Sequence, residues 1–351
     1  MDLKEIGWNA WYEDNSKGLC EPKREPARVI VVDRDRYLIR NEYGEFSAKL
    51  SGKFRFSTDF ETEYPCVGDW VCVQRHESES TATIFNVFPR KSFLRRKSAG
   101  RNIDYQMIGA NIDVALIVQS CHFDFNVRRL ERYLVMVNEG NIEPVVVLTK
   151  TDLVSSDELE ELIFRLQNMG IDAKIIGLSN ITGVGIDKIR DYITTGKTYC
   201  LIGSSGVGKT TLINQLIGES ILDTKTVSGT GEGRHTTVRR QLIVLDNSAM
   251  LIDTPGMREL GILGASDGVD DIYKSIVELS VTCRFSNCTH TNEPGCAVLK
   301  ALENGSINRE HYQNYVKIKK ESEFNEMSYS EKRKKDKDFG KMIRSMKKEK
   351  L

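Results

Sequence analysis

Short runs of apolar and β-branched residues, separated by glycine and proline, dominate residues 26–92 of the chain. The runs are ARVIVV, RYLIR, EFSAKL, DWVCVQR and TATIFNVF, and Gly44, Gly52, Pro65 and Gly68 lie between them. Because no helical period interrupts these strand-like runs, the pattern predicts a small antiparallel barrel of about five strands. An OB-fold is the type of barrel that we expect.

The pattern changes near residue 111, where strand-like runs begin to alternate with helical ones. NIDVALIVQS and EPVVVLTK are typical of buried strands, and the segment between them carries Leu130, Leu134 and Val137 at helical spacing. The alternation continues to about residue 275 and predicts about six strands in a mostly parallel α/β sheet with helices on both faces. QLIVLD and AMLID, separated by a short turn, form the single antiparallel hairpin that we expect in this sheet.

These patterns predict a multidomain protein, and 351 residues are enough for two or three domains. The last part of the chain starts with a group of cysteines, continues with short helices and ends in EKRKKDKDFGKMIRSMKKEKL, a tail too charged to bury itself. The expected boundaries are an N-terminal extension (1–25), the barrel (26–92), a linker (93–110), the α/β domain (111–275) and a small α-helical domain with the basic tail (276–351).

Composition adds few constraints to this division. Apolar residues make up 40% and charged residues 28% of the chain, as in an ordinary soluble protein, and the formal net charge of zero gives no global sign of a nucleic-acid partner. The N-terminus has no signal-peptide pattern and no apolar run reaches the ~18 residues of a membrane span, so we expect a cytoplasmic protein without a membrane partner. The cysteines do not suggest a disulfide framework, because five of them are scattered: Cys20, Cys66, Cys72, Cys121 and Cys200.

The strongest chemical motif is GSSGVGKT, which follows the strand-like TYCLI and precedes the helical TTLINQLIG. Its glycines allow successive backbone N–H groups to surround phosphate oxygens, and the helix N-terminus adds positive potential. Lys209 is expected to contact the β- and γ-phosphates, and the Thr210 hydroxyl is expected to bind Mg²⁺. A plain glycine-rich turn is the alternative, but the spacing and both flanking elements favour a phosphate loop. The expected nucleotide-binding residues are Gly203, Ser204, Ser205, Gly206, Val207, Gly208, Lys209, Thr210 and Thr211.

Two downstream motifs have the positions of nucleotide-sensing switches. DTPG follows the strand-like AMLI, where Asp253 suits the Mg²⁺ shell and the Gly256 N–H suits the γ-phosphate. GRHTT lies in a glycine-rich stretch before it, and either Thr236 or Thr237 could complete the Mg²⁺ coordination. By itself this stretch would be interpreted as a solvated loop, and only the flanking motifs favour a switch.

The tetrapeptide TKTD at residues 149–152 is typical of the loop that recognises guanine. Its Asp152 carboxylate can accept hydrogen bonds from guanine N1–H and the 2-amino group, whereas adenine offers no such pair, so the motif favours GTP over ATP. The next strand-like run, AKIIGL, leads into SNI, where backbone N–H groups can meet guanine O6. The expected base-binding residues are Thr149, Lys150, Thr151, Asp152, Ser179, Asn180 and Ile181.

The guanine motif precedes the phosphate loop by about fifty residues, whereas a GTPase chain normally has the opposite order. In an open α/β sheet the ligand lies across the carboxyl ends of the strands, so loops that meet at this edge can form one site in any chain order. The motif order therefore predicts a circularly permuted P-loop GTPase domain.

Three cysteines and one histidine are closely spaced in CRFSNCTHTNEPGC. Three thiolates and one imidazole supply the four ligands of a closed tetrahedral Zn²⁺ site, and Pro294 and Gly295 allow the chain to turn back between them. A closed site leaves no position for a reactant, so we expect a structural zinc that holds a domain with a very small core. Chance clustering is the alternative, against which the tight spacing argues. The expected ligands are Cys283, Cys288, His290 and Cys296.

The permuted motif order, the OB-like barrel before it and the cysteine cluster after it resemble the RsgA family of bacterial GTPases, also called YjeQ or YloQ, over about residues 26–320. The resemblance implies a cytosolic GTP phosphohydrolase that binds the small (30S) ribosomal subunit during its late maturation and contacts 16S rRNA near the decoding region. It also implies that the subunit stimulates GTP hydrolysis, which then times dissociation. We expect the protein to be a monomer.

Two features of the motifs bear on how such a site would work. The family's usual guanine motif begins with Asn, and Thr149 stands in that place, so the side-chain amide that would bridge the base and the phosphate loop is missing and guanine affinity is expected to be lower. DTPG is followed by Met257, which cannot orient water as the Gln of many GTPases does, so slow intrinsic hydrolysis is expected. His235 resembles the family's proposed switch histidine, which would position the attacking water; an exposed histidine without a catalytic role is the alternative.

RNA contacts are harder to assign from the sequence. The barrel carries aromatic and basic residues close together, a combination that suits single-stranded RNA, although several of these aromatics could belong to the core. The linker PRKSFLRRKSAGR and the C-terminal tail are stronger electrostatic candidates. The barrel residues concerned are Phe54, Phe56, Phe60, Tyr64 and Trp70, with Lys53, Arg55 and Arg75.

Three functions remain open at this point. The first is a GTPase switch whose hydrolysis is stimulated by the small ribosomal subunit. The second is a GTP-sensing, RNA-binding module with negligible turnover, and the third is a permuted GTPase that acts on another RNA. The intact set of Lys209, Thr210, Asp253 and Gly256 favours the first.

Overall fold

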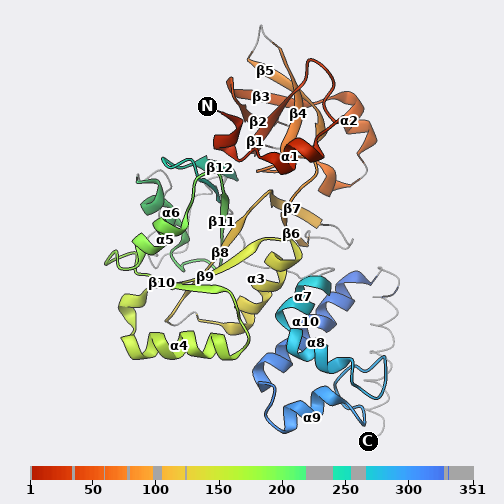
Figure 1. Ribbon diagram of the computed structural model, residues 1–351, viewed down its shortest axis with the longest axis vertical. Coiled ribbons are helices and arrows are strands. Elements are labelled where there is room, and N and C mark those ends of the chain that lie inside the picture. The colour runs from red at the N-terminus through yellow and green to blue at the C-terminus, as the bar shows by residue number, and fades with distance from the viewer. Residues whose placement is uncertain are drawn as a thin grey trace, which may run out of the picture. The chain divides into compact units, whose positions relative to one another are not determined.

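The computed structural model describes residues 2–33, 36–58, 60–76, 80–97, 105–122, 125–218, 240–253, 266–327 and 331. The chain forms two compact units, Met1–Arg95 with Met107–Leu260 and Arg96–Gln106 with Gly261–Leu351, which we call the first and the second unit (Figure 1). Among the described residues, no helix has the length and apolar content that crossing a bilayer requires.

The five short apolar runs near the N-terminus form a closed barrel in the first unit. Its strands pair in the order β1–β2–β3–β5–β4, and β4 pairs back onto β1. Only β3 and β5 pair in parallel, and alternate side chains such as Val29, Ile39, Val71 and Ile84 fill the interior. The prediction of a small barrel is confirmed. The elements are β1 (Glu25–Asp33), β2 (Arg36–Asn41), β3 (Gly44–Leu50), α2 (Gly52–Ser57), η2 (Glu61–Glu63), β4 (Trp70–His76) and β5 (Thr81–Val87).

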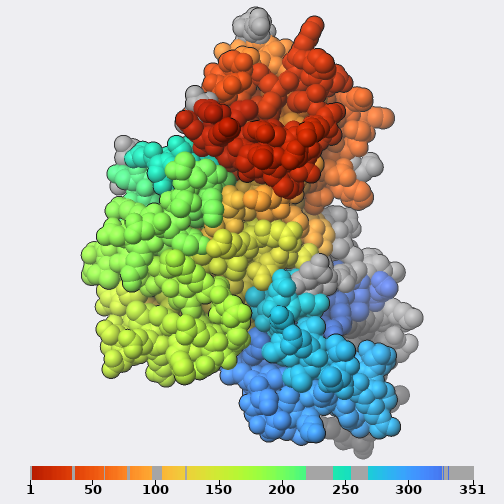
Figure 2. Space-filling model, viewed as in Figure 1, coloured from red at the N-terminus to blue at the C-terminus, as the bar shows by residue number. Residues whose placement is uncertain are grey.

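The N-terminal extension packs onto this barrel through η1 (Leu3–Ile6) and α1 (Ala10–Asn15), drawn in red in Figures 1 and 2. The Trp8 ring lies edge-on to the buried Trp70 ring, with 4.8 Å between the ring centres. A disulfide then joins Cys20 to Cys72 of β4, although we expected no disulfide framework. These two cysteines are 52 residues apart in the sequence, so only the folded extension brings them together.

The segment that we expected to be a linker, residues 93–110, contains two paired strands, β6 (Phe93–Lys97) and β7 (Tyr105–Ala110). Just before it, the Arg90 guanidinium pairs with the buried Asp69 carboxylate at 2.8 Å. Arg90, one of the basic residues that we expected to offer charge to RNA, is therefore paired within the protein.

The alternating strands and helices form the central sheet of the first unit, in the order β10–β9–β8–β11–β13–β12. β12 and β13 pair antiparallel and the other neighbours pair in parallel, as the sequence predicts. In addition, β12 pairs with β1 of the barrel, where Gln241 lies opposite Val31, so both parts share one continuous sheet. The strands are β8 (Val114–Ser120), β9 (Glu143–Thr149), β10 (Lys174–Gly177), β11 (Thr198–Ile202), β12 (Gln241–Val244) and β13 (Met250–Asp253).

Helices cover both faces of the central sheet (Figure 1). On one face, α5 and α6 bury Ile189, Leu212 and Ile213 against alternate strand residues such as Leu116 and Val147. α3 packs against β8 and β9 from the other face. The period of two along the strands and the helical period between them thus produce the layers that the sequence predicts. The helices are α3 (Val127–Glu139), η3 (Thr151–Leu153), α4 (Ser156–Asn168), α5 (Ile186–Tyr192) and α6 (Lys209–Ile217).

A buried arginine, Arg28 of β1, connects the extension, the barrel and the central sheet. Its side chain is 1% exposed and donates to the carbonyl oxygens of Ile6, Gly68 and Asn111, to Thr198 Oγ1 at 2.8 Å and to Met250 Sδ. Thr198 and Met250 begin β11 and β13, the two strands that lead to the phosphate loop and to Asp253. Burial lowers the pKa of Arg28 from its ordinary value.

The second unit is helical and has a small core around the cysteine cluster. Tyr273 is buried, with its ring centre 4.6 Å from that of His311 and 5.3 Å from that of Tyr315. Ile276 and Ile318 are also fully buried. So small a core gives little stability by itself, which leaves a clear role for the cluster. The helices are α7 (Ser266–Ile272), α8 (Lys274–Ser280), α9 (Ala297–Glu303) and α10 (Arg309–Glu326).

Candidate nucleotide site and metal cluster

The predicted phosphate loop connects β11 to α6 at the carboxyl edge of the central sheet. Gly203 and Gly208 both have positive φ angles, of 150° and 99°. A Cβ atom at Gly203 would lie 2.2 Å from the Val118 carbonyl oxygen, so only glycine fits where the loop passes β8. The local geometry is therefore the tight curl that lets backbone N–H groups converge on a phosphate.

Lys209 begins α6, and its side chain folds back over the loop. Its Nζ atom donates to the carbonyl oxygens of Gly203 at 2.8 Å and Ser204 at 2.6 Å. An ammonium in this position lies over the loop in which we expect the phosphates to bind. The neighbouring Thr210 lies in the first turn of the same helix.

Asp253 ends β13, which pairs in parallel with β11, so its carboxylate lies at the same edge as the phosphate loop. Burial raises the pKa of Asp253, and the positive charge of Lys209 partly offsets this effect. Because burial disfavours the ionised carboxylate, a nearby cation stabilises its charged form. A carboxylate in this environment suits the Mg²⁺ shell that the sequence predicts. The other predicted switch residues lie outside the described residues: His235, Thr236, Thr237 and Gly256.

The predicted guanine corner is built from the ends of β9 and β10. Ser179 Oγ donates to Asp152 Oδ1 at 2.5 Å and accepts from the backbone N–H of Ile181 at 3.2 Å. Lys150 adopts a left-handed conformation with φ of 61°, which turns the chain sharply after the strand. One serine thus fixes the carboxylate and shapes the neighbouring loop, leaving the Ile181 side chain 83% exposed.

Two side-chain hydrogen bonds join this corner to the phosphate loop. The Thr149 hydroxyl donates to the Val207 carbonyl oxygen at 2.6 Å, and Asn180 Nδ2 donates to the Gly208 carbonyl oxygen at 3.0 Å. Motifs that are about fifty residues apart in the sequence therefore meet at one edge, as the permuted order predicts. The hydroxyl of Thr149 also makes a bridge where the sequence indicated that a side-chain amide was missing.

Three residues that support this corner were not anticipated. Gln119 offers its carbonyl oxygen 3.2 Å from the Thr149 hydroxyl, and the Cys121 thiol donates to the Thr149 carbonyl oxygen at 3.0 Å. Gln215 of α6 donates to the Asn180 carbonyl oxygen at 2.7 Å. Gln119 lies near the end of a predicted strand and Cys121 directly follows that strand at the ligand edge, which is the one signal that could have found them.

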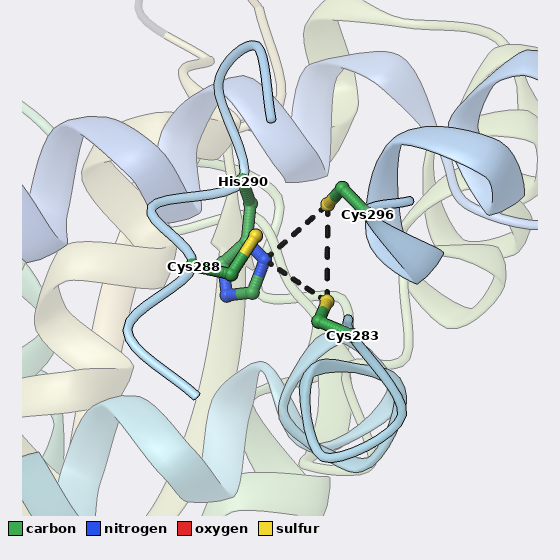
Figure 3. A group of neighbouring side chains, drawn as sticks. All are labelled: Cys283, Cys288, His290 and Cys296. Atoms are coloured by element: carbon green, nitrogen blue, oxygen red, sulfur yellow. Dashed lines mark hydrogen bonds between the residues drawn. The ribbon is translucent and has the colours of Figure 1, made fainter. Parts of the chain in front are cut away.

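The predicted metal ligands meet in the second unit (Figure 3). The ligand atoms of Cys283, Cys288, His290 and Cys296 all lie within 4.8 Å of one another. His290 Nδ1 is 3.6 Å from Cys283 Sγ and 3.5 Å from Cys296 Sγ, and these two sulfurs are 3.9 Å apart. Zinc–ligand bonds of about 2.0 to 2.3 Å give tetrahedral edges of about 3.6 Å between N and S and about 3.8 Å between two S atoms. The cluster is therefore compatible with zinc.

Hydrogen bonds outside the ligand set hold the loop that carries His290. The Tyr312 hydroxyl of α10 donates to the His290 carbonyl oxygen, and Glu293 accepts from the Thr289 backbone N–H at 2.8 Å. Cys296 occupies the N-cap position of α9. The predicted ligands are thus oriented by helices and by a loop that hydrogen bonds hold in place, as a structural metal site requires.

The candidate aromatic residues of the barrel differ in exposure, and Phe54 and Tyr64 are half-buried. Trp70 is fully buried and belongs to the core, whereas Phe56 and Phe60 are 94% and 64% exposed. Lys53 and Arg55, on the same short helix α2 as Phe56, are also exposed. The candidate RNA-contacting surface of the barrel is therefore α2 and the residues that follow it.

Comparisons with known proteins agree with this geometry. The model of the RsgA GTPase family matches residues 87–263. The chain is 42% identical over 298 residues to Small ribosomal subunit biogenesis GTPase RsgA 2 of Lactiplantibacillus plantarum, covering 85% of this chain and 83% of that protein. It is 39% identical over 342 residues to RsgA 1 of Bacteroides thetaiotaomicron, covering 97% and 92%.

Solved structures show the same fold. YjeQ from Thermotoga maritima superimposes with a TM-score of 0.62 at 28% identity and covers 84% of this chain and 97% of that one. YloQ, described as a circularly permuted GTPase, superimposes with a TM-score of 0.60 at 24% identity and covers 85% and 96%. With the family model matching half of its length and both relatives matching most of it, the chain belongs to the RsgA GTPase family and is a circularly permuted P-loop GTP hydrolase.

Proposed function

We propose that the protein binds the small (30S) ribosomal subunit and uses subunit-stimulated GTP hydrolysis to time a step of late subunit maturation. The relatives named above are small ribosomal subunit biogenesis GTPases, which supports this role. The observation that carries the chemical part is the pair of hydrogen bonds from Thr149 and Asn180 to the phosphate loop. These bonds make the base corner and the phosphate loop one continuous site.

Each part of the site has a proposed task. Asp152 accepts hydrogen bonds from guanine, and Ser179 holds its carboxylate in place. Lys209 and the loop amides bind the phosphates, while Thr210 and Asp253 would hold the Mg²⁺ that accompanies GTP and that would neutralise charge on the phosphates. His235 is proposed to position the attacking water. Thr236 or Thr237 would complete the Mg²⁺ coordination, and the Gly256 N–H would sense the γ-phosphate.

The metal cluster is proposed to hold one structural zinc ion. Its three thiolates and one imidazole are the donor set that zinc prefers, and four protein ligands leave no position open for catalysis. The ion would bind the ends of α8 and α9 to the loop of His290. Its contribution is folding free energy for the second unit, not chemistry at the nucleotide.

Binding to 16S rRNA is proposed to use the exposed part of the barrel. Phe56 and Phe60 offer faces on which unpaired bases can stack, and Lys53 and Arg55 supply charge for phosphates. Trp70 is excluded from this surface, because it is buried. We place the protein in the cytoplasm as a monomer, where it meets nearly finished subunits.

The test is GTP turnover by the full-length protein alone, with small subunits and with large subunits. Strong stimulation by small subunits only, lost in Lys209→Ala, is the expected result. Lys188→Ala is a matched control, because Lys188 is an exposed lysine of α5 that lies outside the described contacts of the site.

Two other outcomes would overturn the proposal. If small subunits bind without accelerating hydrolysis, the protein is a GTP-sensing RNA-binding module. If neither subunit binds in competition with other structured RNAs, it is a permuted GTPase that acts on another RNA.

A further inference from the structure

Two neighbouring carbonyl groups of the phosphate loop each accept a hydrogen bond from a different base-side loop. Thr149, fully buried at the end of β9, donates to Val207 O, and Asn180, after β10, donates to Gly208 O. Val207 and Gly208 directly precede Lys209. The two loops that form the predicted guanine corner are therefore hydrogen-bonded to the carbonyl groups of two consecutive residues of the phosphate loop.

Asn180 makes a second hydrogen bond, to the helix that follows the phosphate loop. Its carbonyl oxygen accepts from Gln215 Nε2 at 2.7 Å, and Gln215 lies on α6, the helix that follows the loop. In the same segment, Ser179 fixes the Asp152 carboxylate. Two consecutive residues thus serve the two halves of the site. Ser179 orients the Asp152 carboxylate, and Asn180 contacts the phosphate loop and α6.

The side-chain amide of Asn180 acts here through its donor alone. Its Oδ1 atom is buried and has no hydrogen-bond partner among the described residues, whereas Nδ2 donates to Gly208 O. The contact is also close, because a Cβ atom at Gly208 would lie 2.6 Å from Asn180 Nδ2. A side chain at position 208 would therefore require the amide of Asn180 to move.

We propose that Asn180 is a positioning residue that, together with Thr149, couples guanine recognition to phosphate binding. The two bonds set the separation between Asp152 and the phosphate loop, so that a nucleotide engaging one is aligned for the other. Thr149 and Asn180 share the task that a single side-chain amide at position 149 would perform. This inference rests on the proposed assignment of the guanine corner.

If the hydrogen bonds of Thr149 and Asn180 share this task, their removal should change the free energy of GDP binding in a specific pattern. Each bond alone keeps the two loops close, so removing one is partly buffered by the other. With a net value of about 1 kcal/mol for a hydrogen bond, Thr149→Val and Asn180→Ala should each weaken GDP binding by about 3- to 10-fold. The double variant should lose more than the product of the two single effects, because no bridge remains.

The experiment measures GDP affinity and dissociation rate for the full-length single and double variants, together with their thermal unfolding. Thr149→Ser keeps the hydroxyl and should bind GDP as the unmodified protein does. Val184→Ala is the matched control, because this side chain lies in the same loop, is 66% exposed and does not belong to the expected nucleotide-binding residues. Faster GDP dissociation in the single variants and a more than multiplicative loss in the double variant are expected. Unchanged GDP affinity in Asn180→Ala, or strictly multiplicative effects, would overturn the inference, even if the unfolding temperature falls.

A separate arm tests the assignment on which the inference depends. Asp152→Asn exchanges a pure acceptor for an amide, whose NH₂ suits the 2-carbonyl of xanthine better than the 2-amino group of guanine. Preference should therefore shift from GDP to xanthosine diphosphate. Without this shift the guanine corner itself is wrongly assigned. If the shift occurs while the Asn180 and Thr149 variants bind GDP normally, only the coupling is wrong.

Discussion

Each unit of the protein contains a buried polar cluster, and the two clusters differ in what satisfies them. In the first unit, the Arg28 guanidinium is surrounded by acceptors that the chain itself provides. In the second unit, three cysteine sulfurs and a histidine nitrogen face one another within 4.8 Å. Neutral thiols are weak partners for one another, and thiolates at this separation repel unless a cation lies between them.

The difference indicates how each unit reaches its folded state. Arg28 receives its partners from the extension, the barrel and the strands β11 and β13, so folding completes its hydrogen bonds without a ligand. The cysteine cluster is proposed to gain its stability from a zinc ion, which is not part of the chain. The first unit should therefore fold independently of metal, whereas the second should depend on it.

Removal of the metal ligands tests this contrast most strongly. Cys288→Ser, or chelation of the full-length protein, should unfold the second unit, because structural zinc supplies on the order of 10 kcal/mol. Limited proteolysis and bound-zinc analysis would measure the loss, with GDP binding by the first unit retained. Cys66→Ala, at a buried thiol of the first unit, is the control and should leave zinc content unchanged. A protease-resistant second unit without zinc would contradict the contrast.

Arg28→Met should have the next largest effect, now in the first unit. The substitution leaves several buried acceptors without a donor and should cost about 3 to 5 kcal/mol. Urea unfolding followed by tryptophan fluorescence is suitable, because the guanidinium lies 5.6 Å from the Trp70 ring centre. Arg40→Met, which breaks a partly exposed pair with Glu45, should cost less than about 1 kcal/mol. Equal losses in the two variants would show that the hydrogen bonds of Arg28 are not needed.

The disulfide between Cys20 and Cys72 is a covalent link within the first unit, and its loss should lower the unfolding free energy less than the loss of Arg28. Cys20→Ser should destabilise the first unit by about 2 to 4 kcal/mol, because Cys20 and Cys72 close a long loop in the unfolded chain. Reductant should lower the urea midpoint of the unmodified protein to that of the variant. If reductant has no effect on the unmodified protein, the extension is held without the disulfide, by its aromatic contacts and by hydrogen bonds such as the one from Arg28 to the Ile6 carbonyl oxygen.

The smallest effect concerns an isolated thiol, Cys200 of β11. Burial raises the pKa of Cys200 to about 12 from an ordinary value of 9.0. A raised pKa in the folded state means that the stability from the protonated thiol is complete below about pH 9 and is lost as the pH rises towards 12. Between about pH 8 and pH 10, the gap in unfolding free energy between the unmodified protein and Cys200→Ala should shrink by about 1 kcal/mol. A gap that stays constant would mean that Cys200 ionises as readily in the folded protein as in the unfolded one.

Much of the site follows from local sequence signals. Gly203, Gly208 and Lys209 specify the curled loop, and period-two strands followed by helical runs specify the sheet order around it. Asp152 and Ser179 each follow a predicted parallel strand, so their meeting at the ligand edge could be expected. The predicted metal ligands can also be recognised from the sequence, because they are only a few residues apart.

Contacts between distant residues could not be predicted in the same way. The Asn180 bond to Gly208, the convergence on Arg28, the Cys20–Cys72 disulfide and the pairing of β1 with β12 all join segments with no shared pattern. The pairing of β6 with β7 was missed because the basic residues of this segment resemble a solvated linker.

The sequence by itself determined the barrel, the permuted sheet, the phosphate loop and the cluster of three cysteines and one histidine, since each depends on residue types at short, fixed spacing. Only the tertiary structure decided how these parts are held to one another. Hydrogen bonds and disulfides form where atoms come within a few ångströms, and for residues far apart in the chain this distance is set by the packing of the whole unit.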